Sequence, residues 1–281
     1  MGTQTTLPPV AVARTRPRRY DDHALAAYEE IASVYDAFTR AHDYDRFLDV
    51  IERIARSHGL TGEDVLDIAC GTGKSFMPLL KRGYRVTACD VSPAMVRIAQ
   101  EKSAGLADVI VADMRALPDL GRFDLITCLD DSLNYLLTEA ELAAALRGMA
   151  WSLRPAGLLV FDVNSLRTYR SVFTQTFASD EDGLFFCWRG ETSTDVEEGG
   201  TASATLEAFV PGDAGGWTRH CSQHMQRHHP RSTISGLCSG AGLEVLEVWG
   251  QRPGVRLDPN AVEDEHTKFL YCARRSASIV P

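Results

Sequence analysis

The sequence predicts a doubly wound α/β fold built on a mainly parallel sheet. Between residues 63 and 163, short runs rich in β-branched residues alternate with stretches of helical apolar spacing, which is typical of strands joined by crossover helices. The chain has 281 residues and is 44% hydrophobic, so it can bury the core of one such domain and carry an insertion. We therefore expect one α/β domain with a smaller inserted layer.

The alternation predicts each element of the α/β part. Strands are expected at residues 64–69, 85–89, 108–111, 124–129 and 158–163. Helices are expected near 75–82, 93–103 and 139–153, and the last must end near Pro155, which cannot continue a helix. Two further helices, at 28–38 and 44–58, precede the first strand.

The pattern changes after residue 163. Strand-like segments at 184–194, 201–210 and 216–228 are separated by turns rich in glycine, which predicts an inserted antiparallel meander. A helix at 232–238 and strands at 243–249 and 268–273 then complete a seven-stranded main sheet. We expect five parts along the chain. A disordered basic arm (1–22) is followed by the first helices with the core (23–163), the β-rich insertion (164–230), the rest of the core (231–275) and a tail (276–281).

Charge and cysteine usage exclude several classes of function. The net charge of −9 argues against a nucleic-acid partner, because polyanion binding draws its affinity from clustered lysine and arginine. The seven cysteines are scattered without a CxxC pair, which indicates free thiols in a reducing cytoplasm and no zinc site. No run approaches the ~20 apolar residues of a membrane span, so no membrane partner is expected. The sequence leaves open whether the protein forms a homo-oligomer.

The strongest motif is a buried strand that runs into a glycine-rich turn, with the sequence Val65-Leu66-Asp67-Ile68-Ala69-Cys70-Gly71-Thr72-Gly73. Such a turn lets backbone N–H groups approach an anionic group at a helix N-terminus. A P-loop would require glycine where Ile68 stands, and a dinucleotide fingerprint would require glycine where Phe76 stands. The turn therefore predicts neither an ATPase nor an NAD enzyme.

Two acids follow the next two strands in register with this turn. Asp90 ends the second strand, where a carboxylate can accept hydrogen bonds from both ribose hydroxyls. Asp113 and Met114 follow the third strand, and this pair suits an adenine ring, with the acid on the exocyclic amine and methionine on the face. Helix capping is the alternative interpretation of each acid alone.

Together these features resemble the class I, Rossmann-like S-adenosylmethionine-dependent methyltransferases, over roughly residues 28–163 and 232–273. The family's D-x-G-C-G-T-G loop is matched from Asp67 to Gly73, with Ala69 in place of the first glycine. The N-terminal stretch 28–36 with Asp43-Tyr44 resembles the lid helix of small-molecule members, including amino-sugar N-methyltransferases of antibiotic pathways. The resemblance implies S-adenosyl-L-methionine as cofactor and methylation of a small molecule in secondary metabolism, on nitrogen in preference to oxygen or carbon. A non-catalytic cofactor-binding module is the alternative.

The resemblance also implies roles for individual residues. The backbone of Ala69 and Gly71 would face the methionine part, Asp90 the ribose, and Asp113 with Met114 the adenine. The lid tyrosines would close over cofactor and acceptor. The expected cofactor-binding set is Tyr28, Tyr35, Asp67, Ala69, Gly71, Asp90, Val91, Met95, Asp113, Met114 and Leu129.

Two groups of residues are candidates for acceptor binding or catalysis. Asp130 and Asp131 follow the fourth strand, and they either attract a cationic amine or cap the next helix. On the strand at 216–228, alternation gives a face that is too polar for a buried core, consisting of His220, Ser222, His224, Gln226 and His228. This face is either solvated or a lid over the methyl donor. Histidines spaced i and i+4 on a strand lie ~13 Å apart, so no metal site is expected. The catalytic candidates are His224, His228, Asp131 and Tyr35.

Overall fold

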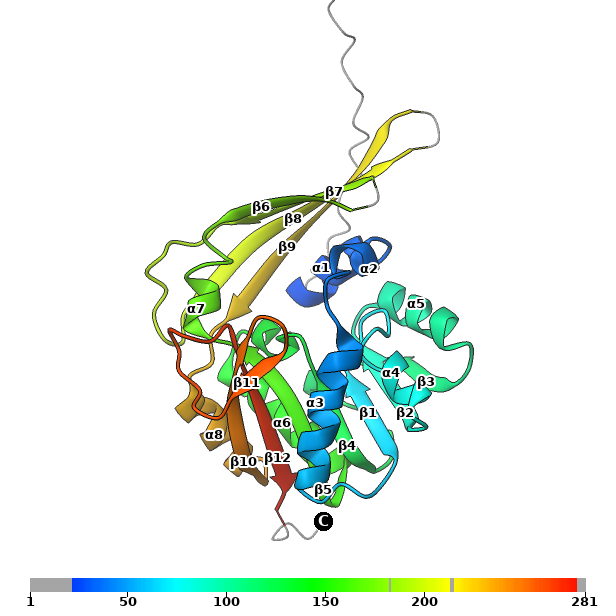
Figure 1. Cartoon of the computed structure of the whole chain (residues 1–281), viewed down its shortest axis with the longest axis vertical. Coiled ribbons are helices and arrows are strands. Elements are labelled where there is room, and N and C mark those ends of the chain that lie inside the picture. Colours follow the sequence, from blue (N-terminus) through cyan, green and yellow to red (C-terminus); the bar gives the residue numbers. More distant parts are fainter. Residues whose placement is uncertain (1–21, 182, 213–214, 277–281) are drawn as a thin grey trace, which may run out of the picture.

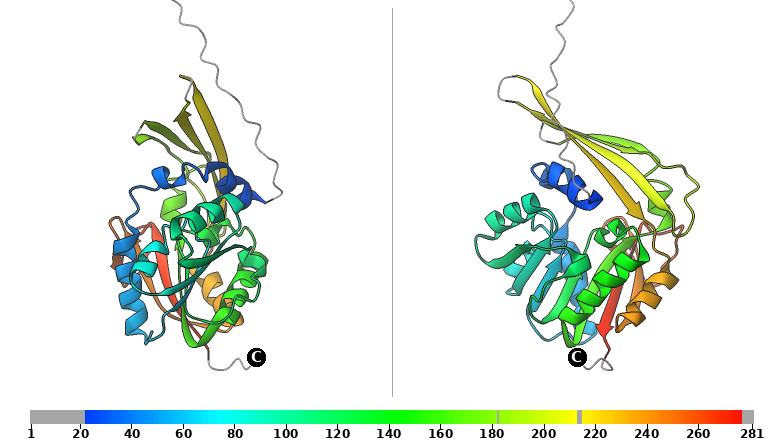
Figure 2. Two further views of the ribbon diagram at one scale, coloured as in Figure 1. Left: turned by 90° about the vertical axis from the view of Figure 1, so that its right-hand side faces the viewer. Right: turned by 180° about the vertical axis from the view of Figure 1, so that it is seen from behind.

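The computed structural model describes residues 22–181, 183–212 and 215–276. Within them, a main sheet with helices on both faces carries a second, antiparallel sheet above its carboxyl edge (Figure 1). Two further views show the N-terminal helices α1 (His23–Ile31) and α2 (Tyr35–Phe38) between the two sheets (Figure 2). The expected basic arm, except for Asp22, and the end of the expected tail lie outside the described residues.

The main sheet has eight strands in the described part of the chain, in the order β11-β10-β12-β5-β4-β1-β2-β3. The strands from β3 to β5 in this order are parallel, and the other three pair antiparallel. Their bounds are β1 Asp64–Ile68, β2 Arg85–Asp90, β3 Ala107–Val111, β4 Phe123–Cys128, β5 Leu153–Asn164, β10 Leu243–Arg252, β11 Arg256–Asp258 and β12 Lys268–Arg275.

The expected count of seven strands is corrected by β11. This strand has three residues, too few for a recognisable alternation, and it pairs antiparallel with the end of β10. Val255 takes a left-handed φ of 62° in the turn between the two strands, and the Arg252 guanidinium bonds to Asp258 at 2.6 Å. The hairpin therefore has a cross-strand ion pair and a strained turn residue, neither of which gives a periodic signal in the sequence.

Helices cover both faces of the main sheet and form two apolar cores. Helices α3 (Tyr44–Ser57), α4 (Met77–Lys81) and α5 (Pro93–Ser103) pack on one face, and α6 (Glu139–Ser152) and α8 (Arg231–Gly240) pack on the other. Local sequence explains where α5 and α6 begin. Ser92 caps α5 by accepting from the Met95 N–H, and Thr138 with Glu141 forms a capping box at α6.

The helix predicted at 28–38 is two helices, α1 (His23–Ile31) and α2 (Tyr35–Phe38). Asp22 caps α1 by accepting from the Leu25 N–H at 2.8 Å, which moves the start of the helix towards the N-terminus. The break allows α1 to pack against β9 (Trp217–Arg227) while Asp36 accepts a 2.5 Å hydrogen bond from Thr72. The tertiary partners therefore override the continuous helical pattern.

The second sheet is an antiparallel meander in the order β6-β7-β8-β9, with bounds Thr176–Glu181, Leu184–Gly190, Thr201–Pro211 and Trp217–Arg227. The three predicted strands β7, β8 and β9 are confirmed. Strand β6 and the short helix α7 (Leu166–Tyr169) were not predicted. Most of β6 is exposed, so its sequence lacks the alternation that marks a half-buried strand.

The polar face of β9 is buried, which corrects the expectation that it is too polar for a core. Ser222, His224 and Gln226 are each at most 3% exposed. Buried polar groups are tolerated when they are hydrogen-bonded, and all three have partners in the protein. Alternation predicted correctly that they share a face, but the packing of α1 and η2 (Ser132–Tyr135) against β9 decides that this face is buried.

Candidate active site

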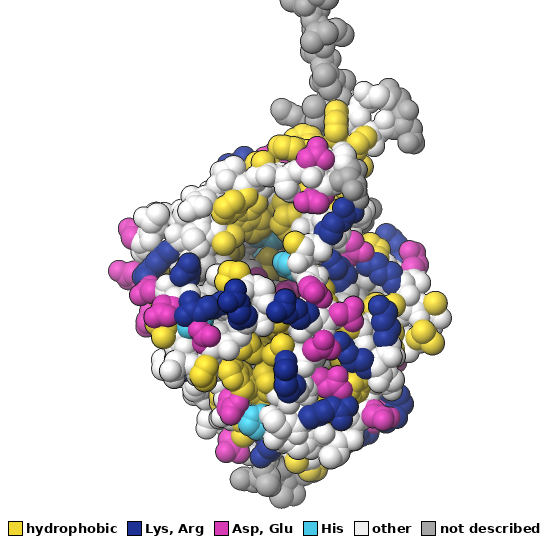
Figure 3. Space-filling view, in the orientation of Figure 1, with side chains coloured by type: hydrophobic (Ala, Val, Ile, Leu, Met, Phe, Trp, Pro, Cys, Tyr) yellow, Lys and Arg dark blue, Asp and Glu magenta, His cyan; other side chains and the backbone are white. Residues whose placement is uncertain are grey.

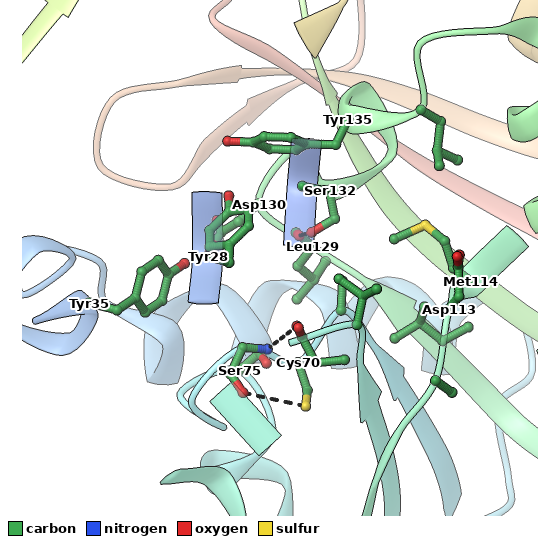
Figure 4. Close-up of a pocket in the computed structure, with 18 of the residues that line it drawn as sticks. Tyr28, Tyr35, Cys70, Ser75, Asp113, Met114, Leu129, Asp130, Ser132 and Tyr135 are labelled. Carbon is green, nitrogen blue, oxygen red and sulfur yellow. Dashed lines mark hydrogen bonds between the residues drawn. The ribbon is translucent and has the colours of Figure 1, made fainter. Parts of the chain in front are cut away.

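A cleft lies at the carboxyl ends of the parallel strands beneath α1, and its empty space is about 920 Å³ when the open solvent at its mouth is included. The space-filling view shows the molecule hollowed between the second sheet and the α/β part, with hydrophobic side chains gathered in the hollow (Figure 3). Asp113 and Met114 lie at one end of the pocket (Figure 4). Tyr28, Tyr35 and Asp130 lie towards the other end.

The turn after β1 forms the floor of the cleft, and three of its residues have a left-handed backbone conformation. Ala69, Gly71 and Gly73 have φ values of 57°, 54° and 87°. A Cβ on Gly73 would lie 2.9 Å from the Phe76 ring, so glycine is required there. A Cβ on Gly71 would meet only Tyr35, at 3.7 Å, because this position faces the cleft. Ala69 and Gly71, whose backbone is expected to face the methionine part of the cofactor, both line the cleft.

Asp67 and Met95 are buried outside the cleft lining. The Asp67 carboxylate accepts hydrogen bonds from Ser75 at 2.5 Å and Thr127 at 2.6 Å, and burial raises its pKa to about 6. Asp67 thereby fixes the turn to β4. Met95 is fully buried and packs with Tyr28 and Tyr35. Both residues belong to the expected cofactor set, and the structure gives them positions that support the cleft from outside.

Asp90 lines the cleft and is held rigidly by the backbone. Its Oδ2 accepts from the Gly71 N–H and its Oδ1 from the Ser92 N–H, each at 2.9 Å. Burial raises the pKa of Asp90, and the two N–H groups oppose this rise. Ser92 provides the cap of α5, so Asp90 is not needed as a helix cap. Each carboxylate oxygen keeps a lone pair for a hydroxyl donor in the cleft. The neighbouring Val91 also lines the cleft.

Asp113 both caps a helix and lines the cleft. Its Oδ1 accepts from the Arg115 N–H at 2.8 Å at the start of the 3₁₀ helix η1 (Met114–Ala116). Burial opposes ionisation, but the hydrogen bonds from Arg115 lower the pKa of Asp113 overall. The Arg115 guanidinium also bonds to Asp22 and Glu141, so it ties the start of α1 to this end of the cleft.

The tyrosines predicted to close the site line the cleft and contact each other. The Tyr28 ring lies edge-on to Tyr35 at 6.0 Å and to Tyr135 at 5.2 Å, between ring centroids. Sequence reasoning missed the residue that holds α1 in place. Glu29 accepts hydrogen bonds from the Ser92 hydroxyl at 2.7 Å and from the Ala94 N–H at 3.0 Å, at the N-terminus of α5. This geometry favours a carboxylate because the helix end is partially positive.

The acidic pair after β4 surrounds a lysine that the sequence analysis did not identify. The ammonium of Lys268 lies 2.5 Å from Asp131, 3.6 Å from Asp130 and 3.7 Å from Asp162. The backbone N–H groups of Asp130 and Asp131 donate to Asp162 at 3.0 and 2.5 Å. The two acids therefore bind the ammonium of this chain's own Lys268. Because Lys268 lies on β12, far along the chain, no local sequence pattern indicates the contact.

Asp130 and Asp131 have different surroundings. Asp130 lines the cleft and accepts a hydrogen bond from the Tyr44 hydroxyl. Burial opposes its ionisation, but Lys268 and His42 lower the pKa of Asp130 overall. Asp131, the catalytic candidate, is not among the lining residues; besides Lys268, it accepts from the Gln226 amide at 2.6 Å.

The two candidate histidines differ in their relation to the cleft. The His224 ring bonds to the Tyr135 hydroxyl at 2.7 Å, and burial lowers its pKa to about 4. It therefore contacts the cleft through Tyr135. His228 accepts from the Gly199 N–H at 3.2 Å and lies 3.5 Å from Glu263, and it is not among the residues that line the cleft.

This arrangement fits an adenosine-bearing sulfonium. The Asp90 carboxylate is free to accept from two hydroxyls, the turn at Gly71 is open towards the cleft, and Met114 and Leu129 supply apolar surface. No group of three or more His, Cys, Asp or Glu side chains in the described ranges is arranged to hold a metal ion.

Comparisons with known proteins agree with this chemistry. Residues 65–157 match the methyltransferase domain family. The Bacillus subtilis (strain 168) protein YqeM, provisionally named a methyltransferase, is 33% identical over 258 residues, which cover 90% of this chain and 99% of the relative. The dTDP-3-amino-3,6-dideoxy-alpha-D-glucopyranose N,N-dimethyltransferase of Streptomyces fradiae is 29% identical, over 77% of this chain and 84% of the relative.

The fold has a close counterpart among solved structures. The crystal structure of an S-adenosylmethionine-dependent methyltransferase from Clostridium acetobutylicum superimposes with a TM-score of 0.75 and 25% identity, over 89% of this chain and 99% of the other. Full-length similarity, a matching domain and a cleft that fits the cofactor thus point to one conclusion. The chain belongs to the Rossmann-like S-adenosylmethionine-dependent methyltransferases and uses S-adenosylmethionine as its cofactor.

Proposed function

We propose that the protein transfers a methyl group from S-adenosylmethionine to a nitrogen of a small molecule, of the kind that an amino sugar carries. One observation carries the preference for nitrogen. The Asp130 carboxylate lies with Tyr28 and Tyr35 at the end of the cleft away from Asp113 and Met114. A half-buried carboxylate accepts charge-assisted hydrogen bonds from the N–H groups of an amine, and the aromatic rings beside it shield these bonds from water.

The other end of the cleft suits the adenosine. In our proposal Asp90 accepts from the ribose hydroxyls, and Asp113 with Met114 holds the adenine. The backbone of Ala69 and Gly71 binds the methionine part, beside Leu129. These residues all line the cleft. The acceptor is then left with the tyrosine-lined end.

The protein's contribution to the reaction is alignment and exclusion of water. When bound, the cofactor supplies an electrophilic methyl group on a sulfonium. Tyr28 and Tyr35 on the N-terminal helices cover the cleft, and Asp130 holds an N–H of the acceptor so that the nitrogen lone pair is presented for in-line transfer. Lys268 keeps Asp130 ionised for this task. A general base is not required when the amine arrives neutral.

A comparison supports the acceptor class, and the cysteines support the cellular setting. The Streptomyces fradiae relative is named for a nucleotide-linked amino sugar, which favours an amino sugar of secondary metabolism as the acceptor here. Each of the seven cysteines is free, and this favours a reducing cytoplasm. Within the described residues, no helix is both long and apolar enough to cross a membrane.

The test is a methyl-transfer assay with labelled cofactor and matched acceptors. We expect label on dTDP-linked amino sugars and none on the corresponding sugars with hydroxyl in place of the amine. Asp130→Asn should lower kcat/KM for the amine by about 10–100-fold with cofactor affinity unchanged, because one charge-assisted hydrogen bond is lost. Asp119→Asn, on an exposed loop, is the matched control.

Two results would contradict the proposal. Equal labelling of the hydroxyl sugars would indicate an O-methyltransferase. The absence of transfer to any acceptor, with the cofactor still bound, would indicate a non-catalytic module.

A further inference from the structure

A buried hydrogen-bonded chain runs from the cleft into the second sheet through Tyr135, His224 and Ser222. The Tyr135 hydroxyl lies 2.7 Å from His224 Nδ1, and the Ser222 hydroxyl lies 2.9 Å from His224 Nε2. His224 and Ser222 are each 3% exposed, and Tyr135 lines the cleft. The chain thus has one end at the acceptor side of the cleft, where Figure 4 shows the Tyr135 oxygen on the side of Tyr28 and Asp130.

The two hydrogen bonds of this chain must point in the same direction, from donor to acceptor. A neutral imidazole has one donor nitrogen and one acceptor nitrogen, and each nitrogen of His224 faces one hydroxyl. Either Tyr135 donates to Nδ1 while Nε2–H donates to Ser222, or both bonds are reversed. The Tyr135 oxygen also has hydrogen bonds with the Tyr28 hydroxyl and the Gln226 amide, and it is the acceptor in both. Its own proton therefore goes to His224 Nδ1, which is the first arrangement.

The surroundings of His224 oppose a role as proton acceptor from the substrate. Its ring is enclosed by Trp188, at 5.3 Å between ring centroids, and by Tyr28, at 5.7 Å. Both ring nitrogens are occupied by hydroxyls, and the ring is absent from the cleft lining. Because burial lowers its pKa to about 4, the ring stays neutral and keeps one donor and one acceptor.

We infer that His224, with Ser222 behind it, is a positioning residue: by accepting the Tyr135 proton it holds the Tyr135 oxygen as a hydrogen-bond acceptor, and an N–H of the acceptor amine takes the place of the Tyr28 hydroxyl there. This inference rests on the proposed N-methylation. A primary amine would then donate one N–H to Asp130 and another to Tyr135. Its lone pair is left for the methyl group, which is the orientation that in-line transfer requires.

The decisive comparison is between His224→Gln and His224→Leu. A glutamine amide has one acceptor and one donor group and can replace the imidazole between the two hydroxyls, whereas leucine can bond to neither. We expect His224→Gln to retain kcat/KM for the amine within about 3-fold, and His224→Leu to lose about 10–100-fold, as one buried hydrogen bond is removed. Cofactor affinity should stay unchanged in both.

A double-variant cycle tests whether His224 acts through Tyr135. Tyr135→Phe should cost about as much as His224→Leu, and the two together should cost no more than Tyr135→Phe alone. Gln223→Leu, on the exposed face of the same strand, is the control and should behave as wild type. Cofactor binding and thermal melting show that each variant is folded.

The outcomes separate this inference from the proposed function. If the wild type methylates the amine but His224→Gln loses as much activity as His224→Leu, His224 is a base and the positioning role is wrong. Additive losses in the double variant would show that His224 does not act through Tyr135. If the wild type methylates no amine, the proposed function fails and this inference fails with it.

Discussion

The carboxylates at the strand ends are chemically alike, and their partners give them different tasks. Asp67 bonds to two hydroxyls beneath the glycine turn, and Asp90 is held by two backbone N–H groups at the cleft. Asp113 is paired with Arg115, and Asp130 with Lys268 and Tyr44. Asp90 thus has no cationic partner in these contacts, and its free lone pairs make it the best acceptor for neutral hydroxyls.

Replacing Asp90 by Ala should therefore weaken S-adenosylmethionine binding by about 1.5–3 kcal/mol, since hydrogen bonds to a charged acceptor are lost. Calorimetry on the variant measures this, with Asp119→Ala as a control on an exposed aspartate. Because Asp90 also accepts two backbone N–H groups, thermal melting must show that the variant folds. A folded variant with wild-type affinity would mean that the ribose binds elsewhere.

Lys268 is the cation for one buried carboxylate, Asp162, and two half-buried ones, Asp130 and Asp131, so its removal leaves uncompensated charge. We expect Lys268→Met to lower the free energy of unfolding by about 3–5 kcal/mol, as is typical when one partner of a buried ion pair is removed. Urea denaturation measures the change. Arg252→Met breaks a more exposed pair with Asp258 and should lower the free energy of unfolding much less, because solvent screens that pair. Equal effects of the two substitutions would argue against a buried cluster.

The sequence predicted those site residues that belong to a local motif. The turn residues and Asp90 follow directly from the strand-to-helix pattern. Lys268, Glu29 and Tyr44 could not be found in this way, because their partners are far along the chain: Tyr44 bonds to a residue 86 positions away, and Glu29 to one 63 positions away. Such pairs depend on tertiary packing and leave no local signal.

At the scale of elements, α1 packs through a buried apolar face and is tied to its neighbours by polar contacts at its edges. Glu29 anchors it to the N-terminus of α5, and Glu30 lies 3.4 Å from His220 on β9. Asp22 at its start bonds to Arg115. Because Tyr28 on this helix lines the cleft, the attachment of α1 should affect binding there.

Glu29→Gln should therefore weaken cofactor binding about 3–10-fold, because a charge is lost at a helix N-terminus and two hydrogen bonds are weakened. Hydrogen exchange of the α1 amides should become faster in the same variant. Glu101→Gln, on the exposed side of α5, serves as the control. Unchanged exchange in α1 would show that Glu29 does not hold this helix in place.

Element types were predictable where one periodicity dominates. The helix predicted at 93–103 matches α5, because serine, proline and the apolar spacing all agree. The helix predicted at 28–38 is split, and β6 was missed, since tertiary contacts determine the first and exposure hides the second. For β9, alternation predicted the shared face of Ser222, His224 and Gln226. Burial of that face depends on partners in other elements.

At the scale of the whole molecule, burial shifts the pKa of two histidines downwards and the pKa of two aspartates upwards, and both shifts act in the same acidic pH range. Burial lowers the pKa of His224 and His229 to about 4. Burial also raises the pKa of Asp67 and Asp162 to about 6. In this pH range the two histidines bind protons more readily in the unfolded chain than in the folded one. The two aspartates bind protons more readily in the folded chain.

These two effects have opposite signs for stability. Between pH 6.5 and 4, an unfolded histidine takes up a proton that folded His224 does not, so the unfolding free energy falls as the pH falls. Between pH 6 and 3.8, folded Asp67 and Asp162 take up protons that the unfolded chain does not, so their contribution to stability rises. The contributions of these four groups should largely cancel in the wild type.

Removing one titrating group should therefore expose the slope that it contributes. In His224→Gln the unfolding free energy should lose less on acidification than in the wild type, by about 1.4 kcal/mol per pH unit below 6.5 and by about 3 kcal/mol in total near pH 4. Asp67→Asn should change the slope in the opposite direction. Urea denaturation of the three proteins across this range measures the difference, and Gln223→Leu controls for substitution on β9. Parallel curves for wild type and His224→Gln would mean that His224 is protonated as readily in the folded chain as in the unfolded one, which its enclosure between Trp188, Tyr135 and Ser222 should prevent.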